Sequence, residues 1–498
     1  MSEAARKHGE EDSRILSEAE CKQILERAHA MAQGGGDTAV HIKSWWQGEL
    51  RWARNRASLS SDRRNIEVTV FRKTDYGTIG EVTTNQLDDA ALEEAVRAAE
   101  RASRMEIGPG GERKGFYPKI PAYTRPPSAR IWSEATVGLD TEVRAEVARR
   151  MIAPAEAEGF YSAGYLEVRA AATASYTTAF RDLRTGEHGL DEQPYIQWTQ
   201  AQCSTTVRDA SGMGSGWAGL SSYDWDRIGS EIDVLAARAV QKCKASRNPV
   251  ALEPGRYTVI LEPQAVADLI ESLVTRLGAP GHRGRESAEN PLMEHPFQLG
   301  YDNATGLMLS KMGLKVVDER ITISHDPMDP RLGLLMSHLE RPGPVTWIEN
   351  GVLKRLGHNF NTGIKALDGI NGLHQLRGGT GYRMSGGDTS MEEMIRTTRR
   401  GLLVTRFSNI RTLDENSLLS TGLTRDGLWL IENGEITKAV KNFRFTESPI
   451  FMLNNVEQIG EAVPVFRPTK EEGGELTPAI VPPIKARDFS FTSLVDAV

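Results

Sequence analysis

Two similar segments with an Asn-Gly pair at their centre constrain the fold of this chain more than any other feature of its sequence. They are residues 347–354 (WIENGVLK) and residues 430–438 (LIENGEITK). Asn and Gly both tolerate positive φ, so the pair fits the type I′ turn that joins two adjacent antiparallel strands. The alternating strand-type residues on either side of each pair therefore predict two tight hairpins and a β-rich region in the second half of the chain.

The size and composition of the chain predict a soluble protein of several domains. At 498 residues the chain is too long for one ordinary hydrophobic core, which favours two or three domains. Hydrophobic residues make up 39% and charged residues 26%, as in soluble globular proteins. No apolar run reaches the roughly 18–20 residues that a membrane helix needs, so no membrane association is expected.

The charge and the cysteines bear on partners and location. The net charge is −7, which gives no global electrostatic reason to bind nucleic acid. Residues 1–14 have mixed charge and no apolar stretch, unlike a signal peptide. Cys21, Cys203 and Cys243 are odd in number, far apart and form no CxxC pair. This usage favours a reducing cytoplasm and disfavours a structural zinc site built from them.

Hydrophobic periodicity predicts both helices and strands in the first half of the chain. The expected helices are 17–32, which begins with a Ser17–Glu20 capping box, 89–104, 140–153, which ends at Pro154, and 226–244. The expected strands are 38–43, 49–54, 66–72, 77–82, 162–180 and 194–208. Residues 105–130 are rich in Gly and Pro and predict a linker, and residues 212–219 predict a loop or bulge.

The second half opens with a strand and a long helix. The strand is expected at 257–261, and Pro263 suits the first position of the helix that follows it. After about residue 315 the pattern is mostly strands and turns, with one helix near 390–400. The predicted class is α/β to α+β. The predicted domains are an N-terminal α/β domain with a mixed sheet (15–125), a middle α+β section (126–248) and a mostly antiparallel β domain with a few helices (249–498).

Several segments, in order along the chain, resemble one protein family. Residues 77–103 read as a strand, a Thr-Asn turn and an Ala-rich helix, and residues 255–269 as a strand that leads into a helix. Residues 387–395 read as a turn and a helix, and they precede a final module made of 401–405, 421–429 and 452–460. Together they resemble the TldD/PmbA (TldE) family, which is tied to zinc metallopeptidases. The resemblance spans roughly residues 20–490, and the order of the segments makes it specific.

The resemblance implies a subunit without its own zinc site. The TldD kind of subunit carries HExxxH on the first helix of the C-terminal domain and a late cysteine, whereas the TldE kind lacks the motif and pairs with a TldD-like partner. The motif frame falls here on Glu271, Ser272 and Arg276, and no cysteine follows Cys243. Arginine cannot donate to a metal, and serine is a poor base at neutral pH. The resemblance thus implies no metal and no catalytic residue in this chain, with zinc, its bound water and a glutamate base in a TldD-like partner.

The histidines leave an alternative open, because imidazole is a common zinc ligand. Six of the ten lie within 92 residues of one another, at 282, 295, 325, 338, 358 and 374, with Glu286, Glu289 and Glu294 near the first two. They could form a relocated metal site and make the chain an autonomous metallopeptidase. Ordinary turn and surface positions are favoured, since no pair shows i, i+4 spacing around a carboxylate base. His325-Asp326 precedes Pro327, which favours a role in a turn.

A glycine-rich segment at residues 377–383 supplies candidates for peptide binding. It could cradle a phosphate between its arginines, but it lacks the Lys-Ser/Thr of a P-loop, so a flexible loop or the wall of a peptide groove is favoured. The wall candidates are Arg377, Tyr382 and Arg383. The expected substrate is an unfolded peptide or small protein, and the expected assembly is a heterodimer. A homodimer and a non-enzymatic regulatory binding module remain as alternatives.

Overall fold

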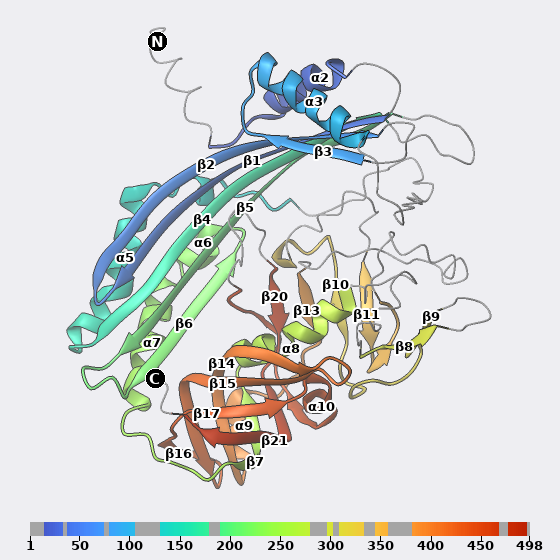
Figure 1. Cartoon of the computed structure of the whole chain (residues 1–498). Coiled ribbons are helices and arrows are strands. Elements are labelled where there is room, and N and C mark those ends of the chain that lie inside the picture. Colours follow the sequence, from blue (N-terminus) through green and yellow to red (C-terminus); the bar gives the residue numbers. More distant parts are fainter. Residues whose placement is uncertain are drawn as a thin grey trace.

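The computed structural model describes residues 14–32, 37–73, 79–104, 130–178, 190–278, 296–301, 308–332, 344–356, 381–467 and 477–495. The predicted linker (105–130) lies outside these residues except for Arg130. Figure 1 shows a long curved sheet that arches over a second, β-rich domain.

The arch is a six-stranded sheet in the order β3-β2-β1-β4-β5-β6. Its strands are β1 (Asp37–Ala53), β2 (Arg56–Lys73), β3 (Ile79–Thr84), β4 (Tyr161–Thr178), β5 (Leu190–Arg208) and β6 (Ser215–Ser222). Every described pairing is antiparallel, so the sheet predicted to be mixed is antiparallel throughout. The β1–β4 pairing runs over 14 residue pairs from Ala39↔Thr177 to Trp52↔Gly164. The sheet is therefore continuous across the predicted boundary between residues 125 and 126.

Helices cover one face of this sheet and leave the other to the second domain (Figure 1). They are α2 (Glu18–Ala30), α3 (Asp89–Ser103), α5 (Thr141–Ala157) and α7 (Ile232–Ala245), with short helices α4 (Glu134–Val137) and α6 (Trp225–Gly229). The covered face consists of alternate residues, such as Val40 and Ile42 under α2 and α3, and Trp46 and Leu50 under α5 and α7. This alternation is the period of a strand with one buried face.

Local signals place most of these helices correctly. The Ser17–Glu20 capping box is confirmed, because each residue bonds the backbone N–H of the other. Pro154 does not end its helix as predicted. It lies in the last turn of α5, where only one backbone hydrogen bond is lost.

Two further predictions in the middle section, the helix at 226–244 and the loop or bulge at 212–219, hold only in part. The single helix expected at 226–244 is divided into α6 and α7, with Ser230 and Glu231 between them. The loop expected at 212–219 gives way to strand β6 from Ser215. A Cβ on Gly216 would lie 2.1 Å from the carbonyl oxygen of Ala239 on α7. This glycine therefore permits close packing of helix on strand and does not mark a turn.

The C-terminal domain contains two larger sheets. One holds β7 (Gly255–Leu261), β14 (Arg400–Asp414), β15 (Leu419–Glu432), β16 (Glu435–Ala439), β17 (Phe443–Glu447), β18 (Val456–Ile459) and β21 (Ile484–Leu494). The other holds β10 (Ile323–His325), β11 (Val345–Glu349), β12 (Val352–Leu353), β13 (Tyr382–Met384), β19 (Val463–Pro464) and β20 (Ala479–Val481). A separate pair comprises β8 (Gln298–Tyr301) and β9 (Met308–Ser310). Only the β7–β14 and β13–β20 pairings are parallel among those described.

Helix α8 (Pro263–Gly278) packs against strands of both sheets, and the three share one hydrophobic core. The remaining helical elements of the described C-terminal residues are α9 (Met391–Arg396), α10 (Pro449–Asn454) and the 3-10 turn η1 (Pro330–Leu332). The predicted fold class is thus confirmed, with helices on an N-terminal sheet and a mostly antiparallel C-terminal domain.

Both Asn-Gly pairs form the predicted tight turns. The φ angles are 48° and 78° at Asn350 and Gly351, and 54° and 86° at Asn433 and Gly434. Each turn joins strands that pair up to its flanking residues, at Glu349↔Val352 and Glu432↔Glu435. The two hairpins belong to different sheets, so they mark both halves of the C-terminal domain.

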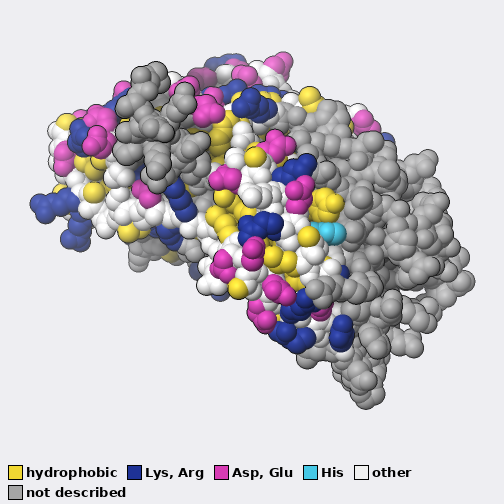
Figure 2. Space-filling model, turned by 90° about the horizontal axis from the view of Figure 1, so that it is seen from above, with side chains coloured by type: hydrophobic (Ala, Val, Ile, Leu, Met, Phe, Trp, Pro, Cys, Tyr) yellow, Lys and Arg dark blue, Asp and Glu magenta, His cyan; other side chains and the backbone are white. Residues whose placement is uncertain are grey.

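The outer surface shows no single-sign charge pattern on the face that Figure 2 displays. Lys and Arg side chains there alternate with Asp and Glu over the coloured part of the surface. In the described residues, no helix is both long enough and apolar enough to cross a membrane.

Candidate functional site at the domain junction

Helix α8 carries a polar stripe on an otherwise apolar sequence. Its buried side chains, fully inaccessible to solvent, are Val266, Leu269, Ile270, Leu273 and Leu277, the face that the sequence predicts. Gln264, Asp268 and Glu271 follow at i, i+4 and i+7, so they share another face of the helix. This stripe turns toward the residues that join the two domains.

Gln264 holds a segment that connects α8 to the N-terminal sheet. Its side-chain oxygen accepts from the N–H of Phe466 and its side-chain nitrogen donates to the carbonyl of Phe466, both at 3.1 Å. The N–H of the next residue, Arg467, donates to Ser221 Oγ on β6 at 2.9 Å. The Phe466 ring meets Trp217 of β6 edge-on, with ring centroids 5.6 Å apart. One side chain of α8 thereby ties the edge strand β6 to the C-terminal domain.

Other polar contacts fasten the same junction. Ser215 Oγ at the start of β6 donates to Asp426 Oδ1 at 2.6 Å. Asp426 also pairs with Arg406, whose guanidinium lies 4.8 Å from the centre of the Trp217 ring. Lys242 of α7 pairs with Glu262, the residue before α8, at 2.6 Å. The junction is therefore built from paired polar groups around aromatic rings.

Asp268 is an unusual acid in this junction. It accepts hydrogen bonds from the N–H of Phe407 at 3.0 Å and from Gln264 Nε2 at 2.9 Å. The surrounding protein desolvates its carboxylate and raises the pKa to about 6, although these bonds and Arg406 and Arg467 act in the opposite direction. The pKa of Asp268 thus lies about two units above the ordinary value for an aspartate.

Glu271 and Arg467 form an ion pair beside Asp268. Arg467 Nη2 lies 3.1 Å from Glu271 Oε1, and Arg467 is only 7% exposed. Burial lowers the pKa of Arg467, but the neighbouring Tyr382, Glu271 and Asp268 outweigh this effect and hold it above its ordinary value. The guanidinium therefore stays charged and balances the acidic groups around it.

Tyr382 completes the cluster from strand β13. It is 2% exposed, and its hydroxyl has no hydrogen-bond partner among the residues that the structure describes. Burial raises the pKa of this phenol to about 12, with Arg467 acting to lower it. We call Asp268, Glu271, Tyr382 and Arg467 the junction cluster.

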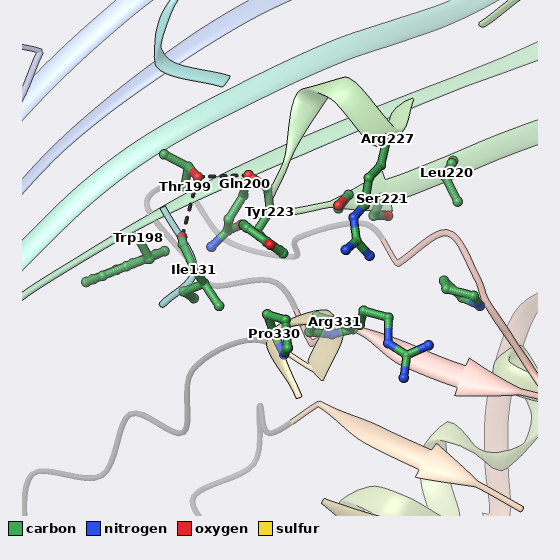
Figure 3. Close-up of a pocket in the computed structure, with 13 residues that line it drawn as sticks. Ile131, Trp198, Thr199, Gln200, Leu220, Ser221, Tyr223, Arg227, Pro330 and Arg331 are labelled. Atoms are coloured by element: carbon green, nitrogen blue, oxygen red, sulfur yellow. Dashed lines mark hydrogen bonds between the residues drawn. The ribbon is translucent and has the colours of Figure 1, made fainter. Parts of the chain in front are cut away.

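A pocket opens next to the junction cluster, between the N-terminal sheet and the C-terminal domain (Figure 3). One wall comes from β5, β6 and α6, and includes Trp198, Ser221 and Arg227. The opposite wall comes from η1, β19 and the residue before β20, and includes Arg331 and Pro464. Ser221 also holds Arg467, so the pocket and the cluster share a residue.

Comparison with known proteins identifies the C-terminal half. Residues 254–493 match the PmbA/TldA metallopeptidase C-terminal domain family. These residues are similar to that domain family over nearly the whole C-terminal domain. The family resemblance seen in the sequence is thereby confirmed. No sequence among the curated proteins matches the chain.

Solved structures extend the shared fold beyond the PmbA/TldA domain. TldE from Thermococcus kodakarensis has 16% sequence identity and a TM-score of 0.68, with 95% of this chain and 99% of that chain covered. A protein named as a modulator of a DNA gyrase from Thermotoga maritima has 16% identity and a TM-score of 0.65, with 95% and 100% covered. A protein named as a modulator of DNA gyrase from Bacteroides thetaiotaomicron has 14% identity and a TM-score of 0.64, with 95% and 98% covered. At these identities the likeness concerns the fold alone.

The metal-motif positions of the PmbA/TldA domain do not fit zinc. Glu271 is paired with Arg467, and Arg276 Nη2 lies 2.5 Å from Glu415 Oε2. The guanidinium of Arg276 has no lone pair to donate to a metal. The guanidinium of Arg467, which lies beside Glu271, would repel a metal cation. The hydroxyl of Ser272 is buried and finds no hydrogen-bond partner in the described part of the chain. Among the described residues, no three His, Cys, Asp or Glu side chains come together as a metal site.

The other predicted site residues take different places in the PmbA/TldA domain. Tyr382 is buried in the junction cluster. Arg383, on the same strand, bonds Asp329 at 3.0 Å and keeps 38% of its side chain exposed. Arg377 and the histidines at 282, 295, 338, 358 and 374 lie outside the described residues, as do Glu286, Glu289 and Glu294.

His325 has a structural contact at the end of β10. It is 1% exposed, and its Nδ1 lies 2.7 Å from the carbonyl oxygen of Gly381. Burial lowers its pKa, so it is neutral at pH 7. The turn predicted here is made by Asp326, whose Oδ1 accepts from the N–H of Met328 at 2.8 Å.

Sequence reasoning missed Asp268, Arg467 and the pocket. The signal for Asp268 was present, since Gln264, Asp268 and Glu271 recur at helical spacing in an apolar helix. Arg467 carried no local signal, because its partner Glu271 is 196 residues away. The pocket depends on the contact between domains and has no counterpart in a linear pattern.

Proposed function

We propose that this chain is a subunit of a TldD/TldE-type zinc metallopeptidase that acts on unfolded peptides or small proteins. In this proposal the chain holds no zinc and completes the site of a TldD-like partner, which supplies the metal and the glutamate base. The observation that supports it best is the Glu271–Arg467 pair. It places a buried positive charge against the first motif position, where a zinc subunit would need a neutral or anionic ligand.

The remaining features support a role in holding peptide. Extended peptides can add to exposed strand edges through main-chain hydrogen bonds. β6 and β19 are edge strands of their sheets, and residues of both line the pocket. Arg383 has the exposed side chain suited to a peptide contact, whereas the side chain of Tyr382 is buried. Arg377 stays a candidate from the sequence.

A cytoplasmic location belongs to the same proposal. The three cysteines are free and buried, and unpaired thiols are typical of a reducing compartment.

Co-purification with a TldD-like subunit tests the proposed function. We expect a stable complex that contains zinc and cleaves an unfolded peptide, with both properties lost when the zinc ligands of the partner are replaced. The isolated chain is expected to bind no stoichiometric zinc by elemental analysis. Zinc and peptidase activity in the isolated chain would instead favour the autonomous enzyme, and absence of both complex and cleavage would favour a regulatory binding module.

A further inference from the structure

The pocket at the domain junction carries an arginine without a counter-charge. Arg227, on α6, makes neither an ion pair nor a side-chain hydrogen bond within the part of the chain that the structure describes, and its one side-chain contact of note is with the Tyr223 ring, 5.8 Å from the ring centre. Asp224, on the same helical turn, accepts bonds from Ser133 Oγ and from the N–H of Asp226. The charge of Arg227 is therefore available to a ligand.

A second arginine stands on the opposite wall. Arg331 Nε and Nη2 lie 2.9 and 2.8 Å from the two carboxylate oxygens of Asp329, which fixes the direction of its side chain. Asp329 also accepts from Arg383 at 3.0 Å. One carboxylate thus pairs with two guanidinium groups, of which that of Arg331 belongs to the pocket lining.

Figure 3 shows how the two walls are related. The Arg227 side chain extends from α6 toward the wall that carries Pro330 and Arg331, and Tyr223 lies on the same side as Arg227. No hydrogen bond of the Tyr223 hydroxyl is present among the described residues. Guanidinium and hydroxyl donors so placed can bind both oxygens of a carboxylate.

The rest of the lining selects an organic anion over a bare ion. Trp198, Pro330, Pro464 and Pro478 contribute apolar surface, and proline has no N–H to offer. An inorganic anion would leave this surface without a partner, whereas the methylene groups and backbone of a peptide would cover it. The edge strands β6 and β19 next to the pocket suit an extended chain.

We propose that this pocket binds a carboxylate of an extended peptide, through Arg227, Arg331 and the Tyr223 hydroxyl. The carboxylate is the peptide C-terminus or an acidic side chain. The inference rests on the proposed function, because that function supplies the peptide, and it adds the chemical class of the group that is recognised.

Binding to the purified full-length chain tests this site. Three dansyl-labelled Gly-Ser-Ala peptides serve as probes: one with a free C-terminus and no acidic residue, one amidated with a single Glu, and one amidated with Gln at that position. Dansyl carries no carboxylate of its own and reports binding by its emission. We expect at least one carboxylate peptide to bind roughly ten-fold or more tightly than the neutral peptide, as charge-assisted hydrogen bonds imply.

The variants separate the site from general peptide affinity. Arg227→Gln should remove the preference for the carboxylate, and Tyr223→Phe should reduce it by a smaller factor. Arg238→Gln is the matched control, since Arg238 is also exposed on a helix of this domain but lies on α7, outside the pocket lining. Circular dichroism and the thermal midpoint should be the same for all three variants and the wild type.

The outcomes differ for the two proposals. Equal binding of neutral and carboxylate peptides, or an unchanged preference in Arg227→Gln, overturns the carboxylate site and leaves the peptidase-subunit function standing. Absence of any peptide binding also overturns the site, while the complex with a TldD-like subunit is judged by its own zinc and cleavage. Comparison of the free C-terminus with the Glu peptide identifies which carboxylate is bound.

Discussion

Arg467 and Glu271 meet at the domain junction, with 3.1 Å between Nη2 of the arginine and Oε1 of the glutamate. The two residues come from the segment after β19 and from α8. Their pairing places a fixed organic cation on the helix that carries the motif positions Glu271, Ser272 and Arg276. The charge of the acidic side chains is balanced here by the protein itself.

Replacing this cation should destabilise the junction strongly. Arg467→Gln leaves Glu271 without the guanidinium with which it pairs, so the free energy of unfolding should fall by roughly 3 kcal/mol. The double variant Arg467→Gln/Glu271→Gln should recover part of this loss. The measurement is urea unfolding, with Arg150→Gln as control. Its exposed pair with Asp233 is expected to contribute less than about 1 kcal/mol. If Arg467→Gln and Arg150→Gln lowered the free energy of unfolding by the same amount, the buried pair would have no special role.

Asp268 should make stability depend on pH. Its pKa is raised to about 6 in the folded protein, above the ordinary value of about 3.9. The folded state therefore binds more protons than the unfolded state between about pH 4 and 6, and this group reduces stability as the pH rises through that window. Asp268→Asn removes the effect. Relative to the wild type, the variant should gain roughly 2 kcal/mol from pH 4 to pH 7. Urea unfolding at several pH values measures this gain, and parallel stability curves would refute it.

Gly381 should not tolerate a side chain. A Cβ there would lie 1.9 Å from the carbonyl oxygen of Leu332 at the end of η1, so either strand β13 or η1 must move. We expect Gly381→Ala to lower the free energy of unfolding by roughly 2 kcal/mol. Gly255→Ala is the control, because its nearest neighbour is Tyr257 Cε2 at 3.9 Å. Chemical denaturation of both variants measures this loss. If Gly381→Ala were as stable as Gly255→Ala, η1 or β13 would move at little cost and the prediction would be wrong.

The thiols should be inert in the folded protein. Burial raises the pKa of Cys21 and Cys203 to about 12 and that of Cys243 to about 11. The thiolate is the reactive form, so a disulfide reagent at pH 8 should label none of the three before unfolding and all three in guanidinium. Rapid labelling of one equivalent under native conditions would mean that one cysteine is accessible.

Features set by neighbouring residues could be predicted from the sequence. The Asn-Gly turns follow from φ angles that few residues adopt, and the strand and helix around Pro263 follow from periodicity. In both cases the deciding interaction joins residues close in sequence. The positions Glu271, Ser272 and Arg276 come instead from the family resemblance, which sets the motif frame on that helix.

Features set by distant contacts could not be predicted. The pairing of β1 with β4 joins the first two predicted domains into one sheet and links residues more than a hundred positions apart. Gly216 of β6 favours a loop in the sequence, whereas its role is to let α7 approach the strand closely. Pro154 predicts the end of its helix, whereas it lies within the last turn of α5. Arg467 became significant only when folding brought it to Glu271.

Phe466 and Arg467 are consecutive residues, and each is bound to a different part of the junction. The Gln264 side chain forms hydrogen bonds with the backbone N–H and carbonyl of Phe466, and Ser221 Oγ accepts from the N–H of Arg467. A shift of β6 away from α8 would therefore pull on Arg467 across a single rigid peptide plane and loosen it from Glu271. A displacement of the arch would thus leave Glu271 on α8 without the charge that balances it.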